Sequence, residues 1–542
     1  MISKSKPHPQ HEADTILDSP PPHTISFLDP DYHTPIKSPS RPPAGIVSCS
    51  SYSSSSSSSS LSQSQLTPKC LTRWLLNVLR PSILSHRPPA PLAPTSYLNG
   101  LRGFAAFLVY WHHHQIWPRT TSFPQQAYLS SSFGYNDQYA FCALPFIRTF
   151  FSGGHFAVGT FFVISGYVLS VKPLSLIHRG EFPRLEESIA SAVFRRHARL
   201  YLPMLGVVFL WIVFLHATGI WVSYPPRGQT LWHDLVMWTW ELRVSTSMFI
   251  GGTPEPWFQW NFHLWTLPYE MRGSVIVYTA LIAFSRARRN ARLWCEVGLC
   301  AYFLIGAEGG CHYAFFVAGL IIADLDLLSQ SSNLPSIFYT PWVRKYKHAI
   351  FYAMFIAGVY LGGVPSRTND FEELRSNPGW YFLSLLKPSW VCAKVPMWFY
   401  LFFAATFLVS SIPHISPLKR FLNHPFCQYL GRISFALYLV HGPVLWTFTD
   451  RLYSAVGWPY TEDHELALGA WVGLMKLPMW GPVGAEFAFL APHLVILPCT
   501  VWVAEVVTRV FDENAIKVTH WAYRRILKPV ERIVPVELQA VG

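Results

Sequence analysis

The chain contains few charged residues for its length. Asp, Glu, Lys and Arg make up only 13% of its 542 residues, against about 25% in an ordinary soluble domain. Hydrophobic residues account for 51% and aromatic residues for 16%, and the apolar residues come in blocks. So few charges exclude an ordinary soluble globular protein. The composition therefore indicates a multi-pass membrane protein.

Cysteine motifs are also absent. The nine cysteines are scattered without a CxxC pair or the Cys/His spacing of a structural zinc site. Three of them, Cys300, Cys311 and Cys499, fall in apolar stretches. We therefore predict no metal site and no disulfide framework.

A single basic stripe is missing as well, although the formal net charge is +12. The Lys and Arg residues lie in short clusters beside apolar stretches, which is how the orientation of membrane proteins is encoded. This pattern predicts a lipid bilayer, and no nucleic acid, as the partner of the basic residues.

Residues 1–90 differ in composition from the rest of the chain. They are rich in Pro, Ser and His, contain an unbroken serine run from Ser53 to Ser60, and do not begin with a basic stretch and a continuous apolar core. We predict a disordered cytosolic segment without a cleavable signal. In residues 71–84, Trp and Leu alternate with Arg73 and Arg80. Two alternatives stay open for this stretch, a helix lying flat on the membrane surface and a disordered link.

From residue 97 to residue 511 apolar runs alternate with short polar loops, which predicts an all-α, polytopic membrane bundle of about ten transmembrane helices. Residues 512–542 are predicted to be a short cytosolic tail. An even number of spans puts both termini on one side, and the loops of that side carry more Lys and Arg, so we predict cytosolic termini in the endoplasmic reticulum or plasma membrane. The candidate spans lie near residues 98–117, 155–171, 200–222, 264–285, 293–308, 311–328, 347–364, 395–412, 430–449 and 484–511.

The first of these spans, residues 97–117, carries both a cation and a histidine. Arg102 and His113 are eleven positions apart, so in a helix they share one face and stand roughly 16 Å apart along the axis. Ionisable groups within a span usually face a cavity or the interior of the bundle, which makes this pair a candidate site. In the alternative, Arg102 extends to the headgroups and the histidines cap the helix at the other interface.

Three further stretches place polar groups at the membrane. FRRHARLYLP carries Arg196 and Arg199 on the predicted cytosolic side, where planar guanidinium groups suit the phosphates of a nucleotide cofactor. The same arginines would also serve as an ordinary positive-inside cluster. Glu270 lies inside an apolar run and is expected to meet His113, or alternatively Arg272. His441 lies in mid-span before Gly442 and Pro443, as in a helix break that lines a cavity.

Five stretches, in their order along the chain, resemble the motifs of the acyltransferase-3 family: LNGLRG with ten residues between its arginine and His113, FFVISGYVL, RRHARLYLP, HLWTLPYE and SFALYLVHGPV. The resemblance implies a bundle of about ten helices that transfers an acyl group, usually acetyl, from acyl-CoA to a hydroxyl of a metabolite, lipid or glycan. It implies acyl-CoA as co-substrate and no metal.

The resemblance also implies roles for particular residues. His113 would be the catalytic base or nucleophile, with Glu270 orienting it. The residues assigned to acyl-CoA are Arg102, Arg196 and Arg199, and those assigned to the pocket are Ser165 and His441.

Three positions depart from the family pattern. Asn99 stands where Asp is common, Thr266 where Ser is common, and Met271 where a second Glu often follows. The lost carboxylate puts in doubt any role that needs two acids. A proton-coupled transporter with a mid-membrane His and Glu is the main rival, and an inactive acyl-lipid sensor is a third class. The sequence shows no internal repeat, which counts against a transporter.

Overall fold

In the computed structural model, the described residues are Thr72 and residues 76–82, 92–119, 131–248, 258–365, 371–458 and 466–527. Of residues 1–90, the segment predicted to be disordered, only Thr72 and residues 76–82 belong to this set, so the prediction for the rest lies outside the described residues. No strand occurs in the described part of the chain, so the all-α prediction is confirmed.

Most of the described chain is helical. The longer helices are α2 (Ser96–Ile116), α5 (Gly154–His178), α6 (Phe182–Thr218), α7 (Leu231–Ser245), α8 (Thr266–Ala283), α9 (Arg289–Ala301), α10 (Cys311–Gln330), α11 (Pro341–Gly362), α14 (Met397–Ser411), α16 (Pro425–Val444), α20 (His493–Val507) and α21 (Glu513–Ile526). Shorter helices are α4 (Arg148–Ser152), α12 (Phe371–Ser376), α13 (Tyr381–Leu385), α15 (Ser416–Leu422), α17 (Asp450–Val456) and α19 (Phe487–Leu490). The 3-10 turn η5 (Phe262–Trp265) and the π-helical turns η6 (Tyr302–Gly306), η9 (Leu445–Thr449) and η10 (Thr508–Asp512) extend some of them.

Five helical stretches in the described chain are long and apolar enough to cross a membrane: Gly154–His178, Phe182–Thr218, Cys311–Gln330, Met397–His414 and Phe487–Ile526. They confirm apolar membrane helices, whereas the count of about ten spans stays a prediction. Helices α2, α8 and α16 have 18 to 21 residues, enough for about 27 Å or more at 1.5 Å per residue. These three helices are more polar than the five stretches above, because they carry the predicted site residues Arg102, His113, Glu270 and His441.

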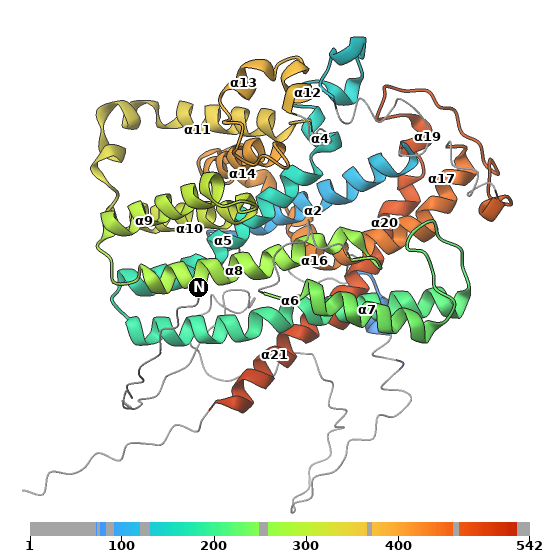
Figure 1. Cartoon of the computed structure of the whole chain (residues 1–542), viewed down its shortest axis with the longest axis horizontal. Helices are drawn as coiled ribbons and strands as arrows, with labels where there is room; N and C mark the ends of the chain where they lie inside the picture. Colours follow the sequence, from blue (N-terminus) through green and yellow to red (C-terminus); the bar gives the residue numbers. More distant parts are fainter. Residues whose placement is uncertain are drawn as a thin grey trace, which may run out of the picture.

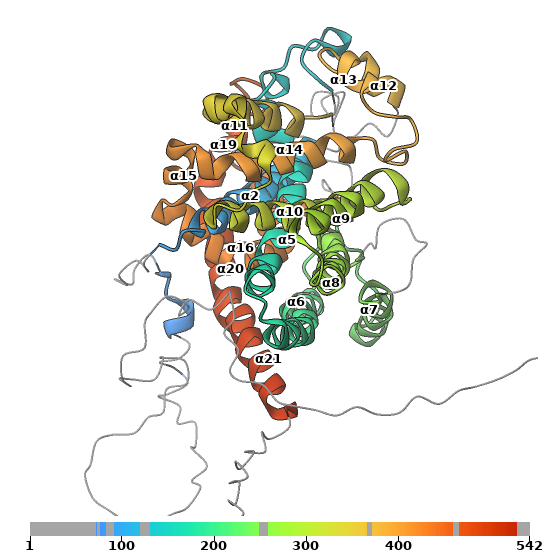
Figure 2. The same cartoon turned by 90° about the vertical axis from the view of Figure 1, so that its left-hand side faces the viewer.

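Helix α2 lies at the centre of the bundle (Figure 1) and packs against α16 on one side and α5 on the other. Two apolar clusters fill the interior, one around α5, α10 and α14 and the other around α6, α8, α16 and α20, and α2 contributes side chains to both. Helix α21 extends away from the bundle beyond α20 (Figures 1 and 2) and contacts α6. The polar face of α2 therefore faces other helices.

Close contact between α5 and α10 depends on glycine. A Cβ atom at Gly319 of α10 would collide with the backbone of Val163, and one at Gly166 of α5 would collide with the backbone of Phe316. Small residues let two backbones approach in this way inside membranes, where dispersion contacts replace the hydrophobic effect. These glycines thus set the distance between the two helices.

A disulfide joins Cys311, at the start of α10, to Cys392, shortly before α14, with their Cα atoms 6.4 Å apart. The prediction of no disulfide framework is wrong at this pair. The two cysteines are separated by 81 residues and are brought together by the packing of α10 on α14. No local sequence motif predicts a pair of cysteines this far apart in the chain.

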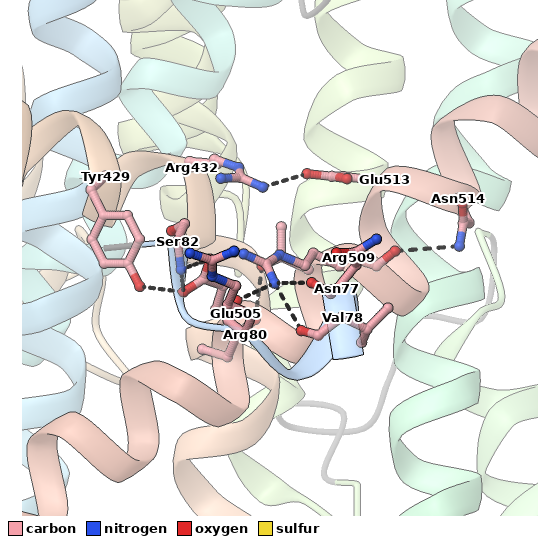
Figure 3. A network of polar contacts seen from close by, with 12 residues as sticks. Asn77, Val78, Arg80, Ser82, Tyr429, Arg432, Glu505, Arg509, Glu513 and Asn514 are labelled. Carbon is pink, nitrogen blue, oxygen red and sulfur yellow. Dashed lines mark hydrogen bonds and ion pairs between the residues drawn. The ribbon is translucent and has the colours of Figure 1, made fainter. Parts of the chain in front are cut away.

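The described residues before the bundle, 76–82, are attached to α20 and to the turn η10 that follows it (Figure 3). Arg509 donates hydrogen bonds to the carbonyl oxygens of Asn77, Val78 and Arg80 over 2.6 to 2.8 Å. The Glu505 carboxylate accepts the backbone N–H of Ser82 at 2.9 Å. A free disordered link is therefore wrong for these residues.

The surface helix proposed for the same stretch agrees with the structure where residues are described. Residues 76–79 are helical, and Leu76 and Leu79 are 65% and 45% exposed. Apolar side chains exposed on a short helix suit a position at the membrane surface. That position stays a prediction.

The glycine contact generates a matched test. Gly319→Ala should lower the free energy of unfolding by about 1 to 3 kcal/mol because the added methyl overpacks the helix contact. The control is Gly298→Ala on α9, where an added Cβ meets nothing within 4 Å, and where Ala should stabilise the helix by up to about 1 kcal/mol. Thermal unfolding midpoints of the purified proteins in detergent measure both. Equal midpoints for the two variants would contradict the packing described.

Candidate active site

Three histidines from distant parts of the chain meet in the interior. His113 lies on α2, His263 in η5 and His441 on α16, and one ring nitrogen of each lies within 4.8 Å of the others. The ring centroids of His113 and His263 are 4.0 Å apart, and those of His263 and His441 are 4.5 Å apart. His263 and His441 are buried and His113 is half-buried. We call these three residues the histidine triad.

Local sequence explains why the triad can form. Gly442 has no side chain, and a Cβ there would stand 2.5 Å from Nδ1 of His263 and 3.0 Å from the Trp446 ring. His263 stacks on Trp446 at a centroid distance of 5.1 Å with an interplanar angle of 10°. Because Gly442 leaves this space, η5 can bring His263 against α16.

The helix break predicted at Gly442 and Pro443 is wrong. Helix α16 continues through both residues and passes through the π-helical turn η9 into α17. Proline lacks an N–H and disturbs a regular helix, and here the wider turn follows it directly. His441 therefore faces the interior from an intact helix.

Hydrogen bonds fix the roles of two triad nitrogens. Nδ1 of His441 lies 3.2 Å from the carbonyl oxygen of Leu437, and its Nε2 lies 3.2 Å from Nδ1 of His113. A carbonyl accepts only, so Nδ1 of neutral His441 carries the proton and its Nε2 has the lone pair. His113 then donates from Nδ1. This assignment leaves the lone pair of His113 on Nε2.

Glu270 belongs to a second cluster. Its carboxylate accepts hydrogen bonds from Arg196 at 2.7 Å and from Ser165 at 2.8 Å, and Arg196 also donates to Ser274 at 2.9 Å. The side chains of Arg196 and Glu270 are only 13% and 17% exposed. The predicted pocket residue Ser165 thus lies between the two charges.

The expected contact between Glu270 and His113 is wrong, and so is the alternative pairing with Arg272. A buried carboxylate takes the cation that faces it, which is Arg196 from α6. Arg272 follows Glu270 by two positions, so it lies on another face of α8, and it donates to the carbonyl of Ser247 at 3.0 Å. The partner of His113 is His441.

Arg102 and Arg199 differ in their surroundings. Arg102 donates to Asn99 at 2.9 Å and to the carbonyl of Gly431 at 2.7 Å, and so ties α2 to α16. Arg199 is half-buried and interacts electrostatically with Asp512. Within the described chain no hydrogen bond engages its guanidinium group. Arg199 is therefore more available to an anion than Arg196 is.

A polar contact lies between the two clusters. Tyr438 on α16 and Thr266 on α8 share a hydrogen bond of 2.7 Å, and Tyr438 also donates to the carbonyl of His263. Thr266 and Glu270 are one helical turn apart on α8. Glu270 and the histidine triad therefore line the same interior without touching.

Sequence reasoning missed His263. His263 is the first residue of HLWTLPYE, so it precedes the apolar run and has no periodic position within a helix. The usable signal was the presence of a histidine directly before a membrane helix, next to the motif that carries Glu270.

Buried histidines and an ion pair inside a helical membrane bundle define a polar reaction site within an apolar protein. A family model described as an acyltransferase domain matches residues 95–491. The chain belongs to the acyltransferase-3 family and is an acyl-transferring enzyme.

Curated relatives are fungal. The chain is 30% identical over 504 residues to the O-acetyltransferase PaAT-1 of Phomopsis amygdali, covering 86% of this chain and 92% of that protein. It is 23% identical to acyltransferase R4 of a Phoma species, over 68% of this chain and 86% of the relative. It is 22% identical to acyltransferase clz18 of Cochliobolus lunatus, over 70% and 89%. No solved structure matches the chain.

The ion pair generates a stability test. Arg196→Met should lower the free energy of unfolding by about 3 to 5 kcal/mol because it leaves the Glu270 charge buried without a partner. The double variant Arg196→Met/Glu270→Gln should regain much of that loss, since it removes both charges. Chemical or thermal unfolding in detergent measures the three proteins.

The matched control is the exposed ion pair of Arg184 with Glu181, whose side chains are 61% and 26% exposed. Arg184→Met should change stability by less than about 1 kcal/mol. A wild-type unfolding midpoint in Arg196→Met would refute the structural role of the pair.

Proposed function

We propose that this protein is a membrane-bound O-acyltransferase that moves an acyl group, most simply acetyl, from acyl-CoA to a hydroxyl of a metabolite, lipid or glycan. The observation that carries the proposal is the hydrogen bond between His113 and His441 inside the bundle. It orients one imidazole with a free lone pair, as a general base requires. The acetyl group and the oxygen acceptor are proposed from the name of the relative PaAT-1, an O-acetyltransferase.

In the proposed reaction, Nε2 of His113 removes the proton of the acceptor hydroxyl. The oxygen attacks the thioester carbonyl, a C–O bond forms, and the C–S bond to CoA breaks. The proton on His113 then passes to the departing thiolate. His441 keeps the His113 ring in the required tautomer, a part that was expected of Glu270. General base catalysis of this kind contributes about 10² to 10⁴ in rate.

Arg199 and Arg102 are proposed to bind the CoA phosphates. Charge-assisted bonds from guanidinium groups suit phosphate, and Arg199 has no hydrogen bond to another described residue. Arg196 is proposed to act indirectly, because its charge is already paired with that of Glu270. The hydrogen-bond partners of Arg102, the Asn99 amide and the carbonyl of Gly431, are neutral, so its charge has no such partner. The expected pair of Arg196 and Arg199 is thus replaced by Arg199 with Arg102.

The disulfide supports the proposed topology of about ten spans with cytosolic termini. The predicted span order puts Cys311 and Cys392 on the side away from the termini. Disulfides persist in oxidising compartments, such as the lumen of the endoplasmic reticulum or the cell exterior. With that orientation α6 begins on the cytosolic side, from which acyl-CoA would reach Arg199 in the middle of this helix.

The base is tested by two variants of neighbouring histidines. Activity is measured as the release of CoA from acetyl-CoA in the presence of an extract that contains the acceptor. In this assay His113→Gln should lower kcat by a factor of about 10² to 10⁴. His114→Gln should keep most of the activity, because residue 114 is turned about 100° around α2 and contacts Tyr453 instead. Mass spectrometry of the acceptors detects the added acetyl group. Full activity of His113→Gln would overturn the proposal.

Positioning by His441 is tested by comparing two substitutions. His441→Leu should lower kcat with little change in KM for acetyl-CoA, because it removes the acceptor for Nδ1–H of His113. His441→Gln should recover part of kcat, since an amide oxygen accepts the same hydrogen bond. Equal loss in both variants would indicate a role in packing alone.

The donor site is tested at Arg199. A charge-assisted hydrogen bond contributes about 1.5 to 3 kcal/mol, so Arg199→Ala should raise KM for acetyl-CoA about tenfold to 150-fold. Arg199→Lys should restore this only in part, because an ammonium lacks the planar fork. Arg195→Ala, whose side chain contacts His520, serves as the control and should keep the wild-type KM. An unchanged KM in Arg199→Ala would remove this residue from the donor site.

A further inference from the structure

The histidine triad has the composition of a metal site. We propose that it binds a divalent cation of the zinc class, and that the bound ion switches off the base activity of His113. The binding stands on the geometry alone. The inhibition rests on the proposed function.

The distances suit one ion between three imidazoles. Zinc binds histidine nitrogens at 2.0 to 2.1 Å, so two such nitrogens in a tetrahedral site stand about 3.4 Å apart. Nδ1 of His113 and Nε2 of His441 are 3.2 Å apart. The largest separation among the three donor atoms is at most 4.8 Å, and closing it needs ring movements of about 1 Å.

The surroundings of the rings also suit metal binding. Histidines that bind metals usually donate their other ring N–H to a carbonyl or carboxylate, and His441 donates Nδ1–H to the carbonyl of Leu437. His263 is 2% exposed, and its Nδ1 has no hydrogen-bond partner within the described structure. Trp446 holds the ring in place by stacking. Two of the three rings are therefore oriented before any ion arrives.

The donor set selects the metal. Imidazole suits zinc, copper, cobalt and nickel, whereas magnesium and calcium prefer oxygen ligands. The triad contains no carboxylate, and the nearby Glu270 is engaged by Arg196 and Ser165. Three histidines also leave a fourth position open for water.

Binding changes the tautomer of His113. In the free site the proton is on Nδ1, which donates to His441, and Nε2 has the lone pair. An ion that takes the lone pair of Nδ1 requires the proton on Nε2 instead. The imidazole is neutral before and after, so no net proton is released. The ring then has no lone pair to offer the acceptor hydroxyl, and transfer stops.

The experiment uses the full-length protein purified in detergent and stripped of metal by a chelator. Cobalt(II) is the spectroscopic probe, because imidazole ligation at a tetrahedral site gives visible absorption bands, and zinc is the inhibitor. We expect one cobalt ion per chain and loss of acetyl transfer on adding zinc, reversed by chelator. His263→Phe should abolish the cobalt bands. Activity of each protein is expressed as a fraction of its own metal-free rate. On that scale, half-inhibition of His263→Phe should need at least about tenfold more zinc than half-inhibition of the wild type.

The matched control is His312→Phe, which removes another buried histidine, packed against Trp398 and outside the triad. It should keep the cobalt bands. A wild-type protein that transfers acetyl groups but binds no cobalt would overturn the inference and leave the proposed function standing. Cobalt bound at the triad in a protein without transfer activity would uphold the binding and refute the proposed function. Acceleration by zinc would overturn the inhibitory role.

Discussion

The ion pair of Arg196 with Glu270 is the interaction on which the interior depends. It joins α6 to α8 and, through Ser165, reaches α5. Two charges placed among apolar helices are tolerated only together. Because Arg196 and Glu270 neutralise each other, the charge of Arg196 is not free to bind an anion. For the same reason Glu270 does not pair with the histidines. The histidines therefore depend on one another for orientation, and Arg199 is the arginine proposed to bind the donor.

The sequence predicted which residues face the interior but not which of them meet. Spacing along a helix gives the depth and face of a residue, so Arg102, His113, Glu270 and His441 could be selected from apolar runs. Partners depend on how helices rotate against each other, and the charge of Arg196 decided the partner of Glu270. His263 and the cysteine pair were missed because neither lies in a periodic pattern.

Two departures from the family pattern have a physical counterpart in the structure. Met271, where a second glutamate often stands, is 5% exposed and packs in the apolar cluster around α6 and α16. Asn99, where aspartate is common, still accepts a hydrogen bond from Arg102 at 2.9 Å and also donates to Gln428. Asn99 thus keeps the contact between α2 and α16 although it has no charge. Met271 does not replace the second carboxylate beside Glu270.

The attachment of residues 76–82 to Arg509 and Glu505 has a consequence for biosynthesis. Ser82 and Glu505 are 423 positions apart, and chains grow at about 5 to 20 residues per second. Ser82 must then wait roughly 20 to 85 s until Glu505 has been added to the chain. The central helix α2 waits almost as long for α16. The nascent protein therefore holds α2, with an arginine and three histidines, without this packing partner until α16 has been made.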